Sequence, residues 1–188
     1  MSRVALKRRR APEKSGSETG YPGFIEPCHP TLRPQAPAGR GWLHEIKHDG
    51  YRAQVHVHAD GLHIYSRNAL DWTKELSAIA RLVGNLPVKE MILDGEAVVL
   101  SRKGVADLQA LRRELGNPDS ERLTYYAFDL LYLDGEDLRD APLIERKTRL
   151  EAILRNAPPQ LAYAEHLVAE GPKVYQNACE LGLEGVVE

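Results

Sequence analysis

The chain has 188 residues, of which 43% are hydrophobic and 28% charged, a composition ordinary for a globular protein with one hydrophobic core. No apolar run is long enough to cross a bilayer and none follows the basic N-terminus, so we expect neither a membrane span nor a secretory signal. The net charge of −2 is unevenly distributed: residues 1–20 hold six bases and two acids, a net +4, and the remainder holds 19 bases and 25 acids, a net −6.

Residues 1–20 contain few large apolar side chains and cannot bury enough surface to offset the entropy of ordering, so we expect a disordered basic tail. The tail could contact nucleic acid, but a solvated tail that only aids solubility explains its charge equally well. Residues 21–41 are rich in proline and glycine and should follow the surface as an irregular lead-in. Cys28 and Cys179 could pair, although two reduced thiols in a cytosolic protein are the simpler interpretation.

After this lead-in the patterns become regular. Residues 52–58 alternate between apolar and polar side chains, Asp60-Gly61 is a turn signal, and residues 62–65 alternate again, which predicts a β-hairpin. Apolar residues at helical spacing predict a helix over residues 72–83.

The second half of the chain mixes strands and helices. Residues 91–100 should form a buried strand, which Asp94-Gly95-Glu96 breaks near its start. The later elements are a helix over 105–115 ended by Gly116, a strand over 123–133 closed by Asp134-Gly135, a basic amphipathic helix over 143–155, a strand near 161–165, a helix near 172–181 and a strand from 185. Two hairpin-like connections among mixed elements predict an α+β fold with mainly antiparallel sheets.

A lysine lies beside acids, a glycine and an arginine just before the predicted hairpin, in the segment Glu45-Ile46-Lys47-His48-Asp49-Gly50-Tyr51-Arg52. Taken alone, Lys47 is better explained as a solvated surface charge and Asp49-Gly50 as a turn. The segment indicates a function only when it is considered together with motifs elsewhere in the chain.

Four acids interrupt or precede strands that are otherwise apolar, namely Asp94, Glu96, Asp129 and Glu184. Buried carboxylates are costly unless they are paired, hydrogen-bonded or bound to metal. A turn at Asp94 followed by Glu96 at a strand edge is the simpler explanation for the first two. Four acids in separate strands instead suggest the floor of a cleft that holds a hard cation.

Five short motifs now occur in the order found in the covalent nucleotidyltransferases, which include DNA ligases, RNA ligases and capping enzymes. They are KHDGYR at 47–52, Ser66-Arg67-Asn68, Asp94-Gly95-Glu96, Phe128-Asp129-Leu130 and Glu184-Gly185-Val186-Val187. Segments 24–28, 42–47, 132–139 and 142–147 resemble the bacterial ATP-dependent DNA ligases linked to end joining. The resemblance runs from about Phe24 to the last residue and implies that residues 21–188 are an adenylation domain with an ATP-grasp-like nucleotidyltransferase fold, mainly antiparallel sheets flanked by helices.

The resemblance also implies a chemistry. In such enzymes a lysine amine attacks the α-phosphate of ATP, forms lysyl-AMP and releases pyrophosphate. A lysine is normally protonated at neutral pH, and a bound cation, neighbouring positive charge and desolvation favour its neutral form. Mg²⁺ would offset the phosphate charge during in-line displacement.

The family motifs suggest a role for each matching residue. Lys47 would carry AMP, Asp49 would support the nucleophile loop and Arg52, Glu45 would contact the adenine amino group, and Phe128 would stack on the base. Arg52 and Arg67 would reach the sugar and the 5′-phosphate of a nick. The expected catalytic residues are Lys47, Asp49 and Arg52; the expected ATP contacts are Glu45, Ile46, Lys47, Arg52, Arg67, Glu96 and Phe128; the expected Mg²⁺ ligands are Glu96 and Glu184.

Two other residue groups have simpler explanations than binding sites. His56 and His58 share one strand face and His63 could lie across the hairpin, but no cysteines or fourth ligand complete a zinc site, so an exposed polar face is the better account. Tyr125 and Tyr126 are better explained as core and strand-edge residues than as a platform for stacking nucleic-acid bases.

Two features depart from the family pattern. Ala69 stands where the family usually has glycine after Ser-Arg-Asn, so a tight loop there should be mildly strained. The family pattern continues beyond Glu184-Gly185-Val186-Val187 to further lysines and an oligonucleotide-binding-fold domain, and we therefore expect a domain incomplete at its C-terminus that seals nicks poorly by itself.

The predicted function is that of an ATP-dependent DNA ligase catalytic domain. The alternatives are an RNA ligase, a capping-type enzyme that uses GTP, and a non-catalytic remnant that binds nucleotide or DNA. The expected partners are ATP, Mg²⁺, nicked or broken double-stranded DNA and end-joining proteins, for a monomer in the bacterial cytoplasm near the nucleoid.

Overall fold

The computed structural model describes residues 10–11, 20–33, 35–37, 39, 41–181 and 183–187. The predicted disordered tail, residues 1–20, lies outside the described residues except at three positions. Two of these, Arg10 and Ala11, lie beside the loop that follows the first hairpin, where Arg10 forms an isolated antiparallel bridge with Leu70.

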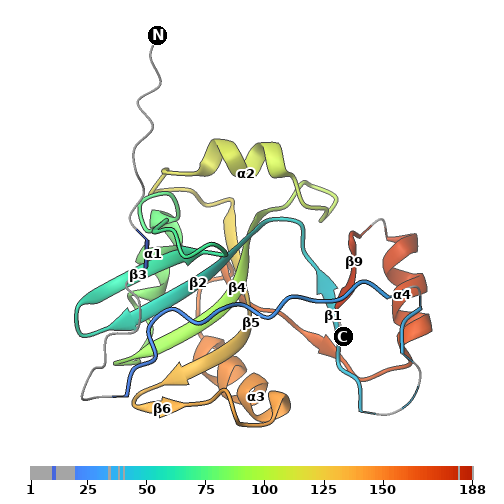
Figure 1. Cartoon of the computed structure of the whole chain (residues 1–188). Coiled ribbons are helices and arrows are strands. Elements are labelled where there is room, and N and C mark those ends of the chain that lie inside the picture. The colour runs from blue at the N-terminus through green and yellow to red at the C-terminus, as the bar shows by residue number, and fades with distance from the viewer. Residues whose placement is uncertain are drawn as a thin grey trace.

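Two sheets form the framework (Figure 1). The larger sheet has the order β3-β2-β4-β5-β6, and β7 pairs with β5 in parallel, whereas every other pairing is antiparallel. Its strands are β2 (Tyr51–His58), β3 (Gly61–Ser66), β4 (Met91–Val99), β5 (Leu123–Leu133), β6 (Glu136–Asp137) and β7 (Leu161–Tyr163). The smaller sheet is antiparallel in the order β8-β1-β9, with β1 (His44–Lys47), β8 (His166–Leu167) and β9 (Gly185–Val187).

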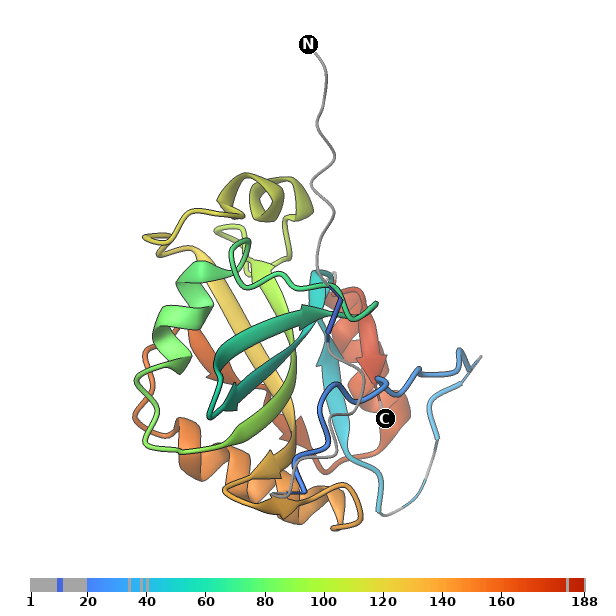
Figure 2. The same cartoon turned by 60° about the vertical axis from the view of Figure 1, so that its left-hand side comes forward.

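Four helices complete the described fold and confirm the predicted α+β class. They are α1 (Ser77–Val83), α2 (Leu108–Glu114), α3 (Leu143–Leu154) and α4 (Gly171–Glu180). Buried residues of α1, α2 and α3 form the main core together with those of the larger sheet, and Figure 2 shows α3 and α1 flanking the long strands. No helix among the described residues is long and apolar enough to span a membrane.

Two of the four helices, α1 and α2, are shorter than predicted at their N-terminal ends, whereas α3 and α4 begin within one residue of the predicted positions. The helix expected over 72–83 begins with turns and becomes α-helical at Ser77. The helix expected over 105–115 begins after Asp107, whose carboxylate accepts a hydrogen bond from Ala110 N and so caps the first turn. The hairpin turns are as predicted, and at Asp134-Gly135 both φ angles are positive, 44° and 96°, as a two-residue turn between twisted strands requires.

The predicted break at Asp94-Gly95-Glu96 is wrong, because β4 is continuous from Met91 to Val99. Only its pairing register with β5 shifts, between Ile92 and Leu93 and between Asp94 and Gly95. Gly95 is needed for close approach rather than for a turn: a Cβ there would lie 2.5 Å from Tyr125 Cζ.

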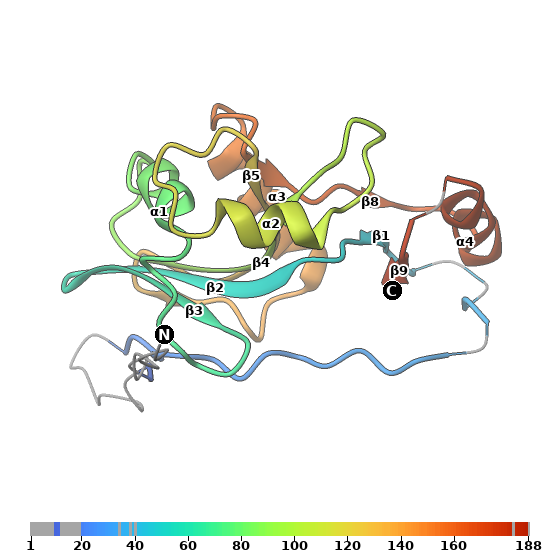
Figure 3. The same ribbon diagram turned by 90° about the horizontal axis from the view of Figure 1, so that it is seen from above.

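The predicted exposed histidine face is also wrong. The lead-in runs along the sheet face opposite α1 and α2 (Figure 3), and His56 beneath it is only 3% exposed. Its two ring nitrogens lie 2.7 Å from the Tyr21 hydroxyl and 2.9 Å from Gln54 Oε1. The side-chain amide of Gln54 also accepts a hydrogen bond from the backbone nitrogen of Ile25 and donates one to its backbone carbonyl. The lead-in therefore supplies both apolar cover and polar partners to this face.

Among the described residues no group of three or more histidines, cysteines or acids could hold a metal ion. Both cysteines are free and exposed.

His56 should make the protein less stable in acid. Burial lowers the pKa of His56 to about 3, whereas a histidine in an unfolded chain titrates near ~6.5. The neutral His56 ring therefore stabilises the folded protein fully above about pH 6.5. This stabilisation is lost as the pH falls towards 3, because in that range only the unfolded chain takes up a proton at this residue. Between pH 7.5 and 5 the wild-type protein should lose about 2 kcal/mol more unfolding free energy than His56→Gln.

Urea denaturation at the two pH values measures this difference, with the exposed His29→Gln as the matched control. Equal losses in wild type and His56→Gln would show that this ring is not the acid-sensitive group.

Gly95→Ala should destabilise the protein by about 1–3 kcal/mol, because the added methyl meets the Tyr125 ring and the Tyr126 carbonyl, each at 2.5 Å. Gly84→Ala is the control, since its methyl would meet nothing closer than 3.4 Å. Unfolding free energies from urea titrations compare the two, and equal values would contradict the close-approach explanation.

Candidate active site

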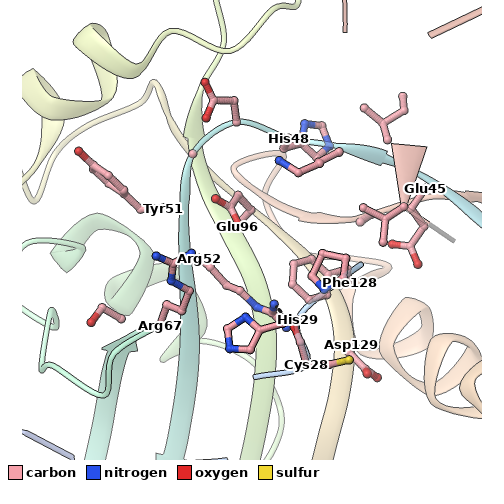
Figure 4. Close-up of a pocket in the computed structure, with 18 of the residues that line it drawn as sticks. Cys28, His29, Glu45, His48, Tyr51, Arg52, Arg67, Glu96, Phe128 and Asp129 are labelled. Atoms are coloured by element: carbon pink, nitrogen blue, oxygen red, sulfur yellow. Dashed lines mark hydrogen bonds between the residues drawn. The ribbon is translucent and has the colours of Figure 1, made fainter. Parts of the chain in front are cut away.

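A cleft with a volume of about 820 Å³ opens between the two sheets (Figure 4). Side chains from β1, β2, β4, β5, the loop after β3 and the lead-in line it. Residues predicted from the sequence account for much of this lining: Glu45, Ile46, Lys47, Asp49, Arg52, Arg67, Glu96 and Phe128.

Lys47 is the last residue of β1, and its side chain is 43% exposed. Its ammonium group forms an ion pair with Glu184, which precedes β9. Lys47 pairs with Gly185 in the β1–β9 ladder, so the register of the smaller sheet brings these charges together.

The loop after Lys47 packs closely against β4. A Cβ on Gly50 would lie 2.3 Å from the carbonyl oxygen of Ala97, so this close approach requires glycine. The His48 ring stacks on Tyr126 with centroids 4.2 Å apart. Asp49 is exposed on this loop and lines the cleft.

Arg52 is held by Asp94 rather than by Asp49. Its Nη2 and Nε donate to the two Asp94 carboxylate oxygens at 2.8 and 3.2 Å, and its Nη1 donates to the Cys28 carbonyl at 2.6 Å. The guanidinium lies 5.3 Å from the centroid of Phe128, an arrangement in which a cation and a ring face attract. Burial raises the pKa of Asp94, although the Arg52 contact opposes that shift.

Three of the four predicted cleft acids have basic partners. Asp94 pairs with Arg52, Asp129 with Arg146 and Glu184 with Lys47. Glu96 has no ion pair or hydrogen bond to another side chain in the described part of the chain. Burial, reinforced by the Asp94 and Glu184 charges, raises the pKa of Glu96 to about 7 despite Arg52 and Lys47.

Glu45 faces a basic residue that was not predicted as part of the site. Lys147 Nζ lies 2.6 Å from Glu45 Oε1, and the Lys147 side chain is completely buried. The sequence could have indicated Lys147, because it falls on the same buried face of α3 as Leu150 and Leu154, where a lysine is unexpected. Nothing in the sequence indicates that Glu45, 102 positions earlier, is its partner.

Arg67 lies in the loop after β3, is exposed and lines the cleft without a hydrogen bond to any described residue. The strain predicted for this loop is present, because Ala69 has a φ of 57°. Tyr125 is fully buried and Tyr126 half-buried, consistent with the predicted structural roles.

Residues 33–188 match the family model described as "ATP dependent DNA ligase domain". The chain is 39% identical over 175 residues to the multifunctional non-homologous end joining protein LigD of Pseudomonas aeruginosa, covering 93% of this chain and 21% of that protein. It is 34% identical to a DNA ligase of Methanoculleus marisnigri, covering 100% of this chain and 36% of that protein. The chain thus spans only a fifth to about a third of these relatives.

Solved structures show the same likeness. The ligase domain of LigD from M. tuberculosis has a TM-score of 0.62 and 33% identity, covering 77% of this chain and 47% of that one. A mycobacterial DNA ligase D complexed with ATP and MES also has a TM-score of 0.62, with 31% identity, covering 81% of this chain and 51% of that one.

Glu96→Gln should stabilise the metal-free protein at pH 8 by about 3 kcal/mol. Because the pKa of Glu96 is raised to about 7, its contribution is complete below about pH 4.5 and is lost as the pH rises through 7. The neutral glutamine avoids that loss, so the two proteins should differ little at pH 5.

Denaturation in EDTA at pH 5 and pH 8 tests this expectation. Glu151→Gln, on an exposed position of α3, is the matched control. A Glu96→Gln protein no more stable than wild type at pH 8 would contradict it.

Proposed function

The chain belongs to the family of ATP-dependent DNA ligase domains, and we propose on this basis that residues 21–188 bind ATP and transfer its AMP to Lys47 for DNA sealing. The observation that carries the proposal is a convergence: Lys47, Arg52, Glu96 and Phe128, from four strands, line one cleft. A cleft of this size suits a nucleotide.

Lys47 would act as the nucleophile. Its nitrogen forms a bond to the α-phosphorus as the bond from that phosphorus to the pyrophosphate oxygen breaks, and pyrophosphate leaves. The ammonium must first lose a proton to solvent, and the Glu184 carboxylate beside it would orient the group. AMP would then pass to the 5′-phosphate of a nick, where a 3′-hydroxyl displaces it.

Residues that line the cleft would contact the base and the sugar of the nucleotide. The face of Phe128 opposite Arg52 would stack on the adenine ring, and Glu45 would accept a hydrogen bond from its amino group. Arg52, fixed by Asp94, would donate to the sugar or phosphates without reorganising. Arg67 at the cleft edge would contact the 5′-phosphate of the nick, and Asp49 would support the nucleophile loop.

The residues present fit a magnesium ion. Glu96 is a largely buried carboxylate that forms no ion pair with any residue the structure describes, and Glu184 lies near enough to influence its pKa. Mg²⁺ commonly uses one or two carboxylates together with substrate phosphates. Glu96 and Glu184 would hold the ion, which when bound neutralises phosphate charge during displacement.

The relatives named as end-joining proteins favour broken or nicked double-stranded DNA as the final substrate. End-joining proteins are the corresponding partners, and DNA repair is the corresponding process.

Incubation with α-labelled ATP and Mg²⁺ should place label on Lys47, and Lys47→Ala should abolish it. Peptide mapping of the labelled protein locates the adduct, and Lys173→Ala, an exposed lysine on α4, is the matched control. A parallel incubation with labelled GTP separates ligase from capping-type chemistry. Label that survives Lys47→Ala, or equal labelling by GTP, would count against the proposal.

A further inference from the structure

Lys147 is a completely buried lysine whose ammonium group reaches the wall of the cleft. Its Nζ lies 2.6 Å from Glu45 Oε1, donates to the Ala164 carbonyl oxygen at 3.3 Å, and is 5.2 Å from the centroid of the Tyr163 ring. The ammonium thus has an acceptor from β1, a second from the segment after β7, and an aromatic face. These contacts hold it in one position.

Stability alone gives a weak reason for such a residue. Removing both charges from water is costly, and replacing a buried ion pair by apolar residues is often neutral or stabilising. Position 147 lies on the apolar stripe of α3 with Leu150 and Leu154, where a leucine or methionine would fit the pattern. The lysine therefore needs another explanation.

Glu45 supplies that explanation, because it faces Lys147 and also lines the cleft near Phe128. The Glu45 side chain is 17% exposed. Burial raises the pKa of Glu45, and the Lys147 charge and hydrogen bond oppose that shift. Oε1 is occupied by Lys147, which leaves Oε2 as an acceptor for a ligand.

We propose that Lys147 is a positioning residue for base selection: by fixing Glu45 as an oriented carboxylate, it makes the cleft select a 6-aminopurine over a 6-oxopurine nucleotide. This inference rests on the proposed nucleotide-binding function. Lys147 itself does not touch the nucleotide and acts only through Glu45.

The chemistry of the two bases explains the selection. A carboxylate can only accept hydrogen bonds, so it matches the amino group at C6 of adenine and opposes the carbonyl at C6 of hypoxanthine or guanine. Without Lys147, the Glu45 side chain can rotate, and it can also take up a proton and donate to a carbonyl. Both changes weaken discrimination between the two bases.

Equilibrium binding of ATP and ITP in the presence of Mg²⁺ tests this role, with Lys47→Ala added to every protein, wild type included, so that no AMP is transferred during the measurement. The two nucleotides differ at the purine 6-position, so the ratio of their dissociation constants is insensitive to any general loss of folded protein. The wild-type protein should prefer ATP by on the order of 10–100-fold, the range for a charged hydrogen bond. Lys147→Met should reduce the preference about tenfold or more, and Lys173→Met, at an exposed position of α4, should leave it unchanged.

Lys147→Gln is the second variant, in case methionine prevents folding. Its amide can donate a hydrogen bond towards Glu45, but the side chain is one bond shorter than that of lysine and carries no charge, so its preference should lie between those of wild type and Lys147→Met. A folded Lys147→Met or Lys147→Gln protein with the wild-type ratio would overturn the role of Lys147.

The double variant Glu45→Gln/Lys147→Met separates selection from stability. Because it removes both buried charges together, it should melt at a higher temperature than Glu45→Gln, in which Lys147 is left without its carboxylate. Its ATP to ITP ratio should equal that of Glu45→Gln, since Lys147 acts through Glu45. Recovery of the wild-type ratio in the double variant would overturn the proposal, and failure of the wild-type protein to bind either nucleotide would overturn the proposed function as well.

Discussion

Arg52 and Asp94 meet on the adjacent strands β2 and β4, where two guanidinium nitrogens bond both carboxylate oxygens. Neither charge would be tolerated in this part of the sheet without the other, because the Asp94 side chain is only 5% exposed. The pair fixes the guanidinium, which in turn contacts the Phe128 ring and the Cys28 carbonyl. One ion pair thus connects two central strands, the lead-in and the Phe128 ring of β5.

Charge pairing also explains how the two sheets share one cleft. Glu45 on β1 of the smaller sheet bonds Lys147 on α3, which packs against the larger sheet. Lys47 at the end of β1 forms an ion pair with Glu184, which directly precedes β9, so the β1–β9 pairing sets the position of the proposed nucleophile. Among the described residues, Glu96 is the one largely buried acid of the cleft that forms no ion pair. The proposed magnesium site would therefore be less stable when empty, a trade between stability and function that is common at active sites.

Local patterns in the sequence were sufficient for the fold class, the hairpin turns and the cleft residues that belong to short motifs. They failed where a residue's environment comes from a distant part of the chain. Gly95 looks like a turn residue because nothing nearby reveals the Tyr125 ring above it, and His56 looks exposed because its cover, Tyr21, lies 35 positions earlier. Lys147 could have been noticed as a lysine on an apolar stripe, but only the tertiary fold identifies Glu45 as its partner.

The lead-in, residues 21–41, contributes directly to the cleft and does more than connect the tail to the sheets. The family match begins at residue 33, yet Cys28, His29 and Pro30 line the cleft. The preceding part of the lead-in is attached to the sheet, because the Ile25 backbone forms two hydrogen bonds with the side chain of Gln54 on β2, two positions from Arg52. The same strand therefore anchors the lead-in through Gln54 and receives its Cys28 carbonyl at Arg52. The lead-in is therefore attached to β2 at two positions two residues apart, and one of them is an arginine of the cleft.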